Sequence, residues 1–222
     1  MYFSSTKIRL IVSCFASTLL LFSGNETLLA KHRKREEPKE YIKKALNLFL
    51  CRNGKVIVEI GSMRNPLPHP IDSGHCNSCM EGHSTAWWAL TGAEVYSIDI
   101  APENTQITSA VCRDFKNVHA ITYDGIAFLK EFKDPIDLLF LDAWDVNKRS
   151  PYAEKHLEAY LTARPRLHAN SLILIDDTDI KHGGKGKLVI PQAISDGYHV
   201  IFGGRQTLLA RLDKLERLLV NQ

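Results

Sequence analysis

The sequence has little of what defines a disulfide-rich, repetitive or nucleic-acid-binding protein. Its 222 residues include only five cysteines, and this odd, scattered set does not form a disulfide framework. The formal net charge is only +3, and much of the excess comes from residues 31–35, so no broad nucleic-acid-binding face and no nucleic-acid partner are expected. No internal repeat is visible. With 45% hydrophobic and 24% charged residues, the chain can form one α/β domain with a sizeable core.

The chain also lacks a long hydrophobic run. Basic residues precede an apolar stretch over residues 10–22, which is typical of a signal peptide, although no A-x-A cleavage site follows it. The stretch is too short to span a membrane comfortably unless it extends to residue 30. A cleaved leader, a membrane association through residues 10–30 and a mis-assigned start are all open. We assign residues 1–40 to a leader and charged linker and expect a globular domain over residues 41–222. This domain is expected to be cytoplasmic, or exported if the leader is cleaved.

Apolar runs typical of strands alternate with segments of helical spacing from residue 41 onward. The predicted strands are residues 56–60, 94–99, 118–122, 136–141 and 171–175. The predicted helices are residues 41–50, 84–90, 104–111, 125–132 and 153–161. Nearly continuous apolar strands between helices indicate a parallel sheet covered on both faces. Residues 198–202 and 207–212, separated by a Gly-Gly turn, predict a terminal hairpin. The expected fold is therefore α/β: a doubly wound, mostly parallel seven-stranded sheet with an antiparallel C-terminal hairpin.

Acidic residues lie at or just after the ends of four successive predicted strands. Ligands of an open α/β sheet bind beyond the carboxyl ends of the strands, so these residues are candidates for a ligand site. Glu59 can anchor the first loop or a ligand's amino group, and Gly61 lets the backbone approach a ligand closely. Asp99 can accept both hydroxyls of a ribose. Asp124 and Asp142 occupy the corresponding places after the third and fourth strands.

At these residues the chain resembles the class I S-adenosylmethionine-dependent methyltransferases, over roughly residues 55–212. The resemblance implies a Rossmann-like fold, S-adenosylmethionine as the cofactor and a small-molecule methyl acceptor, with Asp124 meeting the adenine amino group. The cofactor-binding residues that it implies are Glu59, Gly61, Ser84, Asp99, Asp124 and Asp142.

Residues 62–81 interrupt this resemblance, because family members usually run directly from the Glu-x-Gly turn into the first helix. We interpret the segment as an insertion over the cofactor site, acting as a lid or as part of the acceptor pocket. Ser84 or Thr85 is expected to be the N-cap of the delayed helix.

The insertion and the residue that follows it contain a C-x-x-C pair with flanking histidines. His75, Cys76, Cys79 and His83 could offer four zinc ligands. The His75–Cys76 spacing is cramped and no second C-x-x-C pair exists, so two free or paired thiols are expected rather than zinc.

Asp176 and Asp177 follow the fifth predicted strand. With Asp142 they resemble the cation site of the metal-dependent O-methyltransferases of the catechol and caffeoyl-CoA type. This resemblance implies that Asp142, Asp176 and Asp177 hold Mg²⁺ or another divalent cation, which would orient the acceptor oxygens. Two departures are present: Asp177 replaces the family's Asn, and Asp145 replaces its lysine.

The predicted catalytic residues are Asp142 and Lys148, with Lys148 near the place of the missing lysine. Other candidate bases are His83, His156 and His182. Residues 182–187 are predicted to form a mobile basic loop that either contacts an acidic acceptor or is simply solvated. It does not follow a strand in the Walker pattern, which excludes a P-loop.

The predicted function is O-methylation of a small hydroxylated acceptor, and two alternatives stay open. A nicotinamide-dependent oxidoreductase would require G-x-G-x-x-G after the first strand, where the chain has only Gly61. A methyltransferase-like domain without catalysis, serving as a binding or scaffold domain, would retain S-adenosylmethionine binding without turnover. The sequence specifies neither the acceptor nor the oligomeric state.

Overall fold

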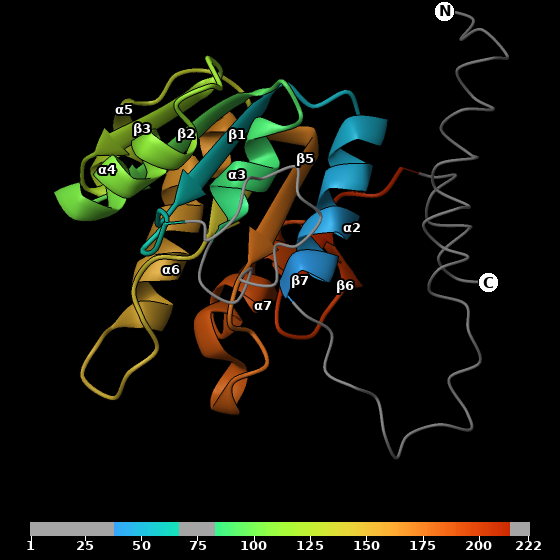
Figure 1. The fold of residues 1–222 in the computed structure, drawn as a ribbon. Helices are drawn as coiled ribbons and strands as arrows, with labels where there is room; N and C mark the ends of the chain where they lie inside the picture. The colour runs from blue at the N-terminus through green and yellow to red at the C-terminus, as the bar shows by residue number, and fades with distance from the viewer. Residues whose placement is uncertain (1–37, 67–82, 214–222) are drawn as a thin grey trace, which may run out of the picture.

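The computed structural model describes residues 38–66 and 83–213, which form a twisted sheet between two layers of helices (Figure 1). The strands are β1 (Val56–Ile60), β2 (Glu94–Asp99), β3 (Val118–Thr122), β4 (Ile136–Leu141), β5 (Leu167–Ile175), β6 (His199–Phe202) and β7 (Thr207–Ala210). The helices are α2 (Pro38–Cys51), α3 (Ser84–Ala89), α4 (Pro102–Val111), α5 (Gly125–Glu131), α6 (Tyr152–Ala163) and α7 (Val189–Ser195). Two short 3-10 segments, η2 (Arg164–Arg166) and η3 (Lys181–Gly186), flank β5.

The seven strands are ordered β3-β2-β1-β4-β5-β7-β6. The first five are parallel, and β7 pairs antiparallel with both β5 and β6. This order confirms the predicted doubly wound sheet and its C-terminal hairpin. Because the chain leaves β1 for one edge and returns at β4 for the other, the strand order reverses between β1 and β4. A ligand site is expected at that reversal, beyond the carboxyl ends of the strands.

The centre of the sheet is buried on both faces, as the nearly continuous apolar residues of β1, β4 and the second half of β5 require. Along β4, side chains alternate between the two faces, so Phe140 packs with Trp88 on one side while Leu139 packs with Tyr160 on the other. Helices α2 and α3 cover the first face, and α5, α6 and α7 cover the second.

The predicted elements are all present, with small differences at their ends. Strand β5 begins at Leu167, before the expected apolar run. Leu167 already pairs with Ile136 of β4. After a register shift past the exposed Ala169 and Asn170, the parallel pairing with β4 resumes at Leu172. The sequence did not predict α7, whose seven residues include Pro191 and bury only Val189 and Ala193. A helix this short gives too little periodicity to be recognised.

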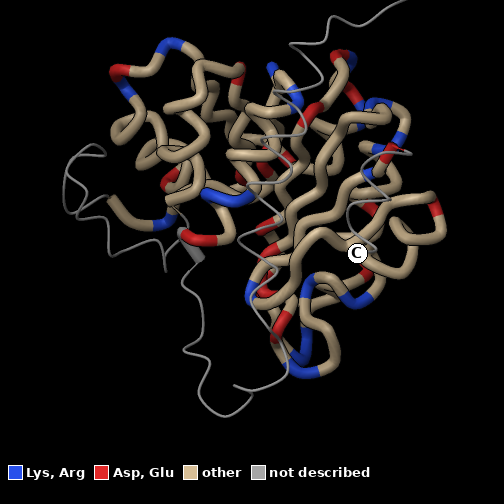
Figure 2. The backbone as a smooth tube through the Cα atoms, turned by 90° about the vertical axis from the view of Figure 1, so that its right-hand side faces the viewer, with Lys and Arg blue, Asp and Glu red and all other residues tan. Residues whose placement is uncertain are grey.

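Basic and acidic residues are interspersed over the described chain (Figure 2), in keeping with the small net charge. Within residues 38–66 and 83–213, no helix has the length and apolarity to cross a membrane. The predicted leader lies outside the described residues.

Candidate functional site

The turn after β1 passes very close to the end of β4. Gly61 has a φ of +105°, and a Cβ at this position would lie 2.9 Å from both the Ala143 nitrogen and the Asp142 carbonyl carbon. The amide of Gly61 donates to the Ile98 carbonyl at 2.8 Å. Only glycine combines this backbone conformation with this approach, so Gly61 fixes the backbone at the point where the strand order reverses.

Asp99 ends β2 and connects the loop after β1 to the start of α4. Its carboxylate accepts hydrogen bonds from the Ser62 amide at 2.9 Å, the Ala101 amide at 2.9 Å and the Asn104 side-chain amide at 3.1 Å. A carboxylate offers about four lone-pair sites, so capacity remains for a ligand hydroxyl. The side chain of Ile100 next to it is 73% exposed and gives the same end of the sheet an apolar surface.

Glu59 lies beneath this surface, enclosed by the protein and out of reach of a ligand in the cleft. Its side chain is fully buried and accepts hydrogen bonds from the hydroxyls of Ser84, Thr85 and Ser97 and from the indole Nε1 of Trp88. Burial raises the pKa of Glu59 to about 7, although the four hydrogen bonds oppose this shift.

The expectation that Ser84 or Thr85 caps α3 is wrong. The N-cap residue is His83, which makes no side-chain capping bond, because both hydroxyls instead donate to Glu59. The side chains of Glu59 and Ser84, both predicted to bind cofactor, therefore bind each other below the site.

Asp124 is the N-cap of α5 and accepts a hydrogen bond from the Ala127 amide at 2.8 Å. Asp124 does not line the cleft into which Asp99 and Asp142 face. Its predicted contact with an adenine amino group stays a prediction.

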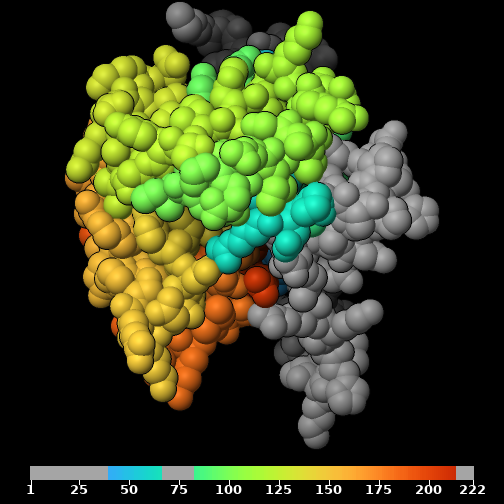
Figure 3. Space-filling view, turned by 60° about the vertical axis from the view of Figure 1, so that its left-hand side comes forward, coloured from blue at the N-terminus to red at the C-terminus, as the bar shows by residue number. Residues whose placement is uncertain are grey.

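A cleft of about 410 Å³ runs along the carboxyl ends of the strands. Toward β2 it is lined by Gly61, Ser62, Asp99 and Asn104. Toward β5 it is lined by Asp142, Asp176, Asp177, Lys185 and Arg205. Figure 3 shows the segment after β1 (cyan) between the green elements that follow it and the orange and red C-terminal part. The cleft thus brings together residues from opposite halves of the sheet.

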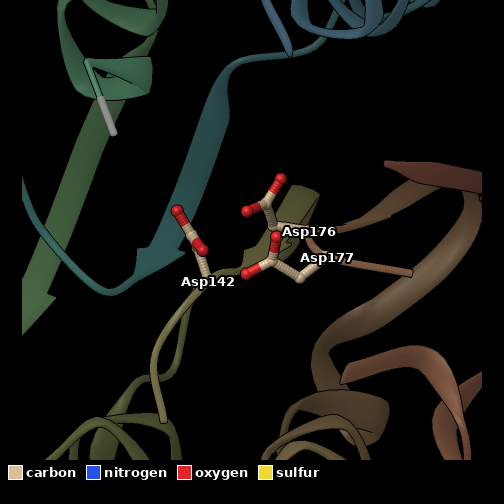
Figure 4. A group of neighbouring side chains, drawn as sticks. All are labelled: Asp142, Asp176 and Asp177. Atoms are coloured by element: carbon tan, nitrogen blue, oxygen red, sulfur yellow. The ribbon is translucent and has the colours of Figure 1, made fainter. Parts of the chain in front are cut away.

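Three carboxylates converge in the half of the cleft toward β5 (Figure 4). Asp142 follows β4, Asp176 and Asp177 follow β5, and one oxygen of each lies within 4.8 Å of the other two. The parallel pairing of β4 with β5, which sets Leu141 beside Ile175, places these residues side by side. We call this group the acidic cluster.

Lys185 lies against the acidic cluster, although the sequence did not identify it. Its Nζ lies 2.6 Å from Asp142 Oδ1 and 3.4 Å from Asp177 Oδ2, and it donates to the Asp142 carbonyl at 2.9 Å. The residue is 1% exposed. Burial alone would lower the pKa of Lys185, but Asp142 and the other two carboxylates raise it above its usual value, so the side chain is an ammonium.

A second cation, Arg205, comes from the turn between β6 and β7. Its Nη2 lies 2.8 Å from Asp177 Oδ1 and 3.7 Å from Asp176 Oδ2. The side-chain amide of Gln206 donates to Asp176 Oδ1 at 2.8 Å. Burial and the Asp142 carboxylate raise the pKa of Asp176 to about 8, against the opposing effect of Lys185.

The segment that carries Lys185 is folded back, whereas a mobile basic loop was expected. His182, Gly183 and Gly184 all have positive φ, and a Cβ on Gly184 would lie 1.7 Å from the Asp177 carbonyl oxygen. The amide of Lys185 donates to that oxygen at 3.3 Å. The two glycines before Lys185 permit this tight turn and are the sequence signal that could have indicated it.

None of the predicted bases lines the cleft. Lys148 is exposed in the loop before α6, and His182 is exposed in η3. His83 is buried, with Nε2 3.0 Å from the Asn65 carbonyl oxygen. His156 is also buried, which lowers its pKa to about 4, and its Nδ1 lies 2.6 Å from the Tyr152 carbonyl oxygen. Of the predicted catalytic pair, the structure places Asp142 in the cleft and Lys148 outside it.

The predicted zinc ligands His75, Cys76 and Cys79 lie outside the described residues. Among the described cysteines, Cys112 is a buried free thiol. The part of the insertion that the structure describes includes Arg64, which binds Asp145 through both guanidinium nitrogens at 3.1 and 2.6 Å. This pair borders the cleft. The hydrogen bonds that Arg64 donates lower the pKa of Asp145.

The three carboxylates lie close enough together for the divalent cation that the sequence implied, but two side-chain cations lie beside them. Such a cation needs free carboxylate oxygens, whereas Lys185 and Arg205 already neutralise much of the cluster's charge. The predicted roles of Asp142, Asp176 and Asp177 as metal ligands are therefore not supported by the contacts of these residues.

Comparison with known proteins agrees with the fold. A family model described as a methyltransferase domain matches residues 79–178. The SAH-bound methyltransferase PaMTH1 of Podospora anserina superimposes with a TM-score of 0.53 and 17% identity, covering 96% of this chain and 98% of its own. The O-methyltransferase of Bacillus cereus in complex with SAH superimposes with a TM-score of 0.53 and 14% identity, covering 90% of this chain and 91% of its own. No curated protein matches the sequence. The chain therefore has the Rossmann-like fold of class I methyltransferases.

Proposed function

We propose that this protein is an S-adenosylmethionine-dependent methyltransferase. The observation that carries the proposal is the cleft at the reversal of strand order, where Gly61 allows close backbone approach and Asp99 presents a carboxylate. The methyltransferase-domain match and the two SAH-bound structural neighbours support the same activity.

The half of the cleft toward β2 suits the cofactor. Asp99 is held by three donors in a fixed orientation, so it can accept a ribose hydroxyl without reorganising. The exposed side chain of Ile100 offers an apolar surface against which an adenine ring can pack.

The half toward β5 suits a polar acceptor, and we assign O-methylation of a small hydroxylated molecule to it. Bound S-adenosylmethionine supplies an activated methyl group, so the protein has only to align the acceptor and accept its proton. Asp142 is placed to accept a hydrogen bond from an acceptor hydroxyl. Its carboxylate then accepts the proton as the methyl group is transferred to the oxygen, and the nearby Lys185 ammonium stabilises negative charge that develops there. In this reaction the side chains of Asp142 and Lys185 do the work without a metal ion.

Calorimetric titration of the full chain with S-adenosylmethionine tests the proposal. We expect saturable binding to the wild type and binding weakened about tenfold to a hundredfold in Asp99→Ala, which loses hydrogen bonds to a charged acceptor. Asp114→Ala is the matched control, since Asp114 is an exposed acid away from the cleft. A folded wild type that does not bind the cofactor would overturn the proposal. Binding without methyl transfer to any hydroxylated acceptor would favour the scaffold alternative.

A further inference from the structure

The acidic cluster has almost no carboxylate oxygen without a protein donor or cation beside it. Asp142 Oδ1 and Asp177 Oδ2 face the Lys185 ammonium. Asp177 Oδ1 and Asp176 Oδ2 face the Arg205 guanidinium. Asp176 Oδ1 accepts from the Gln206 side-chain amide. Together these five contacts involve five of the six carboxylate oxygens.

Both cations are fixed by the fold. Lys185 is almost fully buried, and the conformation of Gly183 and Gly184 directs its backbone against the Asp177 carbonyl. The backbone of Arg205 is held against the segment after β5, because its carbonyl accepts a hydrogen bond from the Thr178 amide at 2.8 Å. Moving either side chain away from the carboxylates would leave buried charges unpaired, which is strongly unfavourable.

We infer that Lys185 and Arg205 are permanent counter-ions of the acidic cluster and take the place of a divalent cation in this cleft. A metal ion bound to Asp142, Asp176 and Asp177 would have to lie beside the ammonium and the guanidinium, which repel it, or displace both. The two side chains also differ from a metal in what they offer a ligand: directional N–H donors rather than open coordination positions. The metal exclusion does not depend on the proposed activity.

Titration of the full-length chain with Mn²⁺, followed by electron paramagnetic resonance of free Mn²⁺, tests the inference. We expect no saturable binding at the acidic cluster of the wild type. Lys185→Met keeps the length of the side chain, removes the charge and is expected to create a Mn²⁺ site, which a second change, Asp176→Asn, then abolishes. Lys187→Met is the control, because Lys187 is an exposed lysine of the same segment.

The result that would overturn the inference is saturable Mn²⁺ binding by the wild type that Asp176→Asn removes. A folded Lys185→Met protein that gains no Mn²⁺ binding would also contradict the role assigned to the lysine. If Lys185→Met does not fold, Lys185→Gln provides the second variant, and the wild-type titration still decides. Titration of the same samples with S-adenosylmethionine separates the two hypotheses, since loss of cofactor binding speaks only against the proposed methyltransferase activity.

Discussion

Glu59 and the acidic cluster both lie at the carboxyl ends of parallel strands, and their surroundings differ. Glu59, at the end of β1, is fully buried and surrounded by neutral donors: three hydroxyls and an indole. The acidic cluster after β4 and β5 is instead surrounded by cations and lines an open cleft. Similar residues at similar strand positions have therefore acquired different roles.

The difference shows why position after a strand is a weak guide to function. The hydroxyls around Glu59 come from α3 and β2, so that the carboxylate joins β1 to the next helix and strand. In the cleft, the carboxylates are joined to η3 and to the β6–β7 turn, and they retain contact with solvent on one side. We expect changes at Glu59 to affect stability, and changes in the cleft to affect ligand binding more than stability.

The largest effect on stability is expected for Glu59→Ala. Removing the carboxylate leaves four buried donors without their acceptor, which should cost about 3–5 kcal/mol of unfolding free energy. Glu59→Gln should cost much less, because its carbonyl oxygen can still accept from Ser84 and Trp88 while the Thr85 and Ser97 hydroxyls rotate to accept from the amide. Urea denaturation of both variants measures the difference. Equal losses in the two would contradict a hydrogen-bonding role.

Gly184→Ala is expected to be next, with a loss of about 3 kcal/mol. The added Cβ would overlap the Asp177 carbonyl, and the φ and ψ of +48° and −141° are unfavourable for any side chain. Gly183→Ala is the matched control: its Cβ would have no contact closer than 3.6 Å, so only the positive φ should cost about 1 kcal/mol. Thermal melting compares them. Similar losses would show that the turn is not held tightly against the acidic cluster.

The contribution of Glu59 to stability should also depend on pH. The folded-state pKa of Glu59 is raised from 4.5 to about 7, so the folded protein binds its proton more tightly than the unfolded chain. The contribution is therefore fully present below pH 4.5 and is lost as the pH rises through about 7, by up to about 3 kcal/mol. Comparison of wild type with Glu59→Gln across this window isolates the effect. An identical pH profile in the two proteins would argue that Glu59 is already ionised at low pH.

The smallest effect on stability is expected for Arg64→Ala at the border of the cleft. The Arg64–Asp145 pair has good geometry, but its side chains are 52% and 61% exposed, so its loss should cost only about 0.5 kcal/mol. Asp145→Ala should give the same small change, which chemical denaturation can measure. A loss comparable to that of Glu59→Ala would mean that the border of the cleft is as structural as the buried carboxylate.

Much of the fold could be predicted because its signals are local. The strand limits of β1 to β4 followed from short apolar runs, which in β1 and β4 are buried on both faces, and the hairpin from the Gly-Gly turn between two short strands. Asp99 and Asp142 were identified as cleft residues because parallel strands present their carboxyl ends at one edge. Helix α7 and the early start of β5 were missed because pairing and packing, rather than periodicity, define them.

The partners of the acids could not be predicted in the same way. Glu59 and Asp99 both lie at strand ends, yet only the packing of α3 against β1 and β2 shows that hydroxyls enclose the first. Lys185 is one of several lysines in polar segments, and nothing in its spacing from Asp142 reveals a contact across 43 residues. Lys148 is much nearer in the sequence but is exposed to solvent.

The sequence by itself determined the alternation of strands and helices, the direction of the sheet and the edge at which acids accumulate, because these depend on hydrophobic periodicity and strand polarity. The tertiary structure alone decided which acids are enclosed and which line the cleft. It also decided that the charges facing the acidic cluster are Lys185 and Arg205. Burial and charge pairing arise between segments distant in the chain, and the strength of each depends on distances that only the folded structure sets.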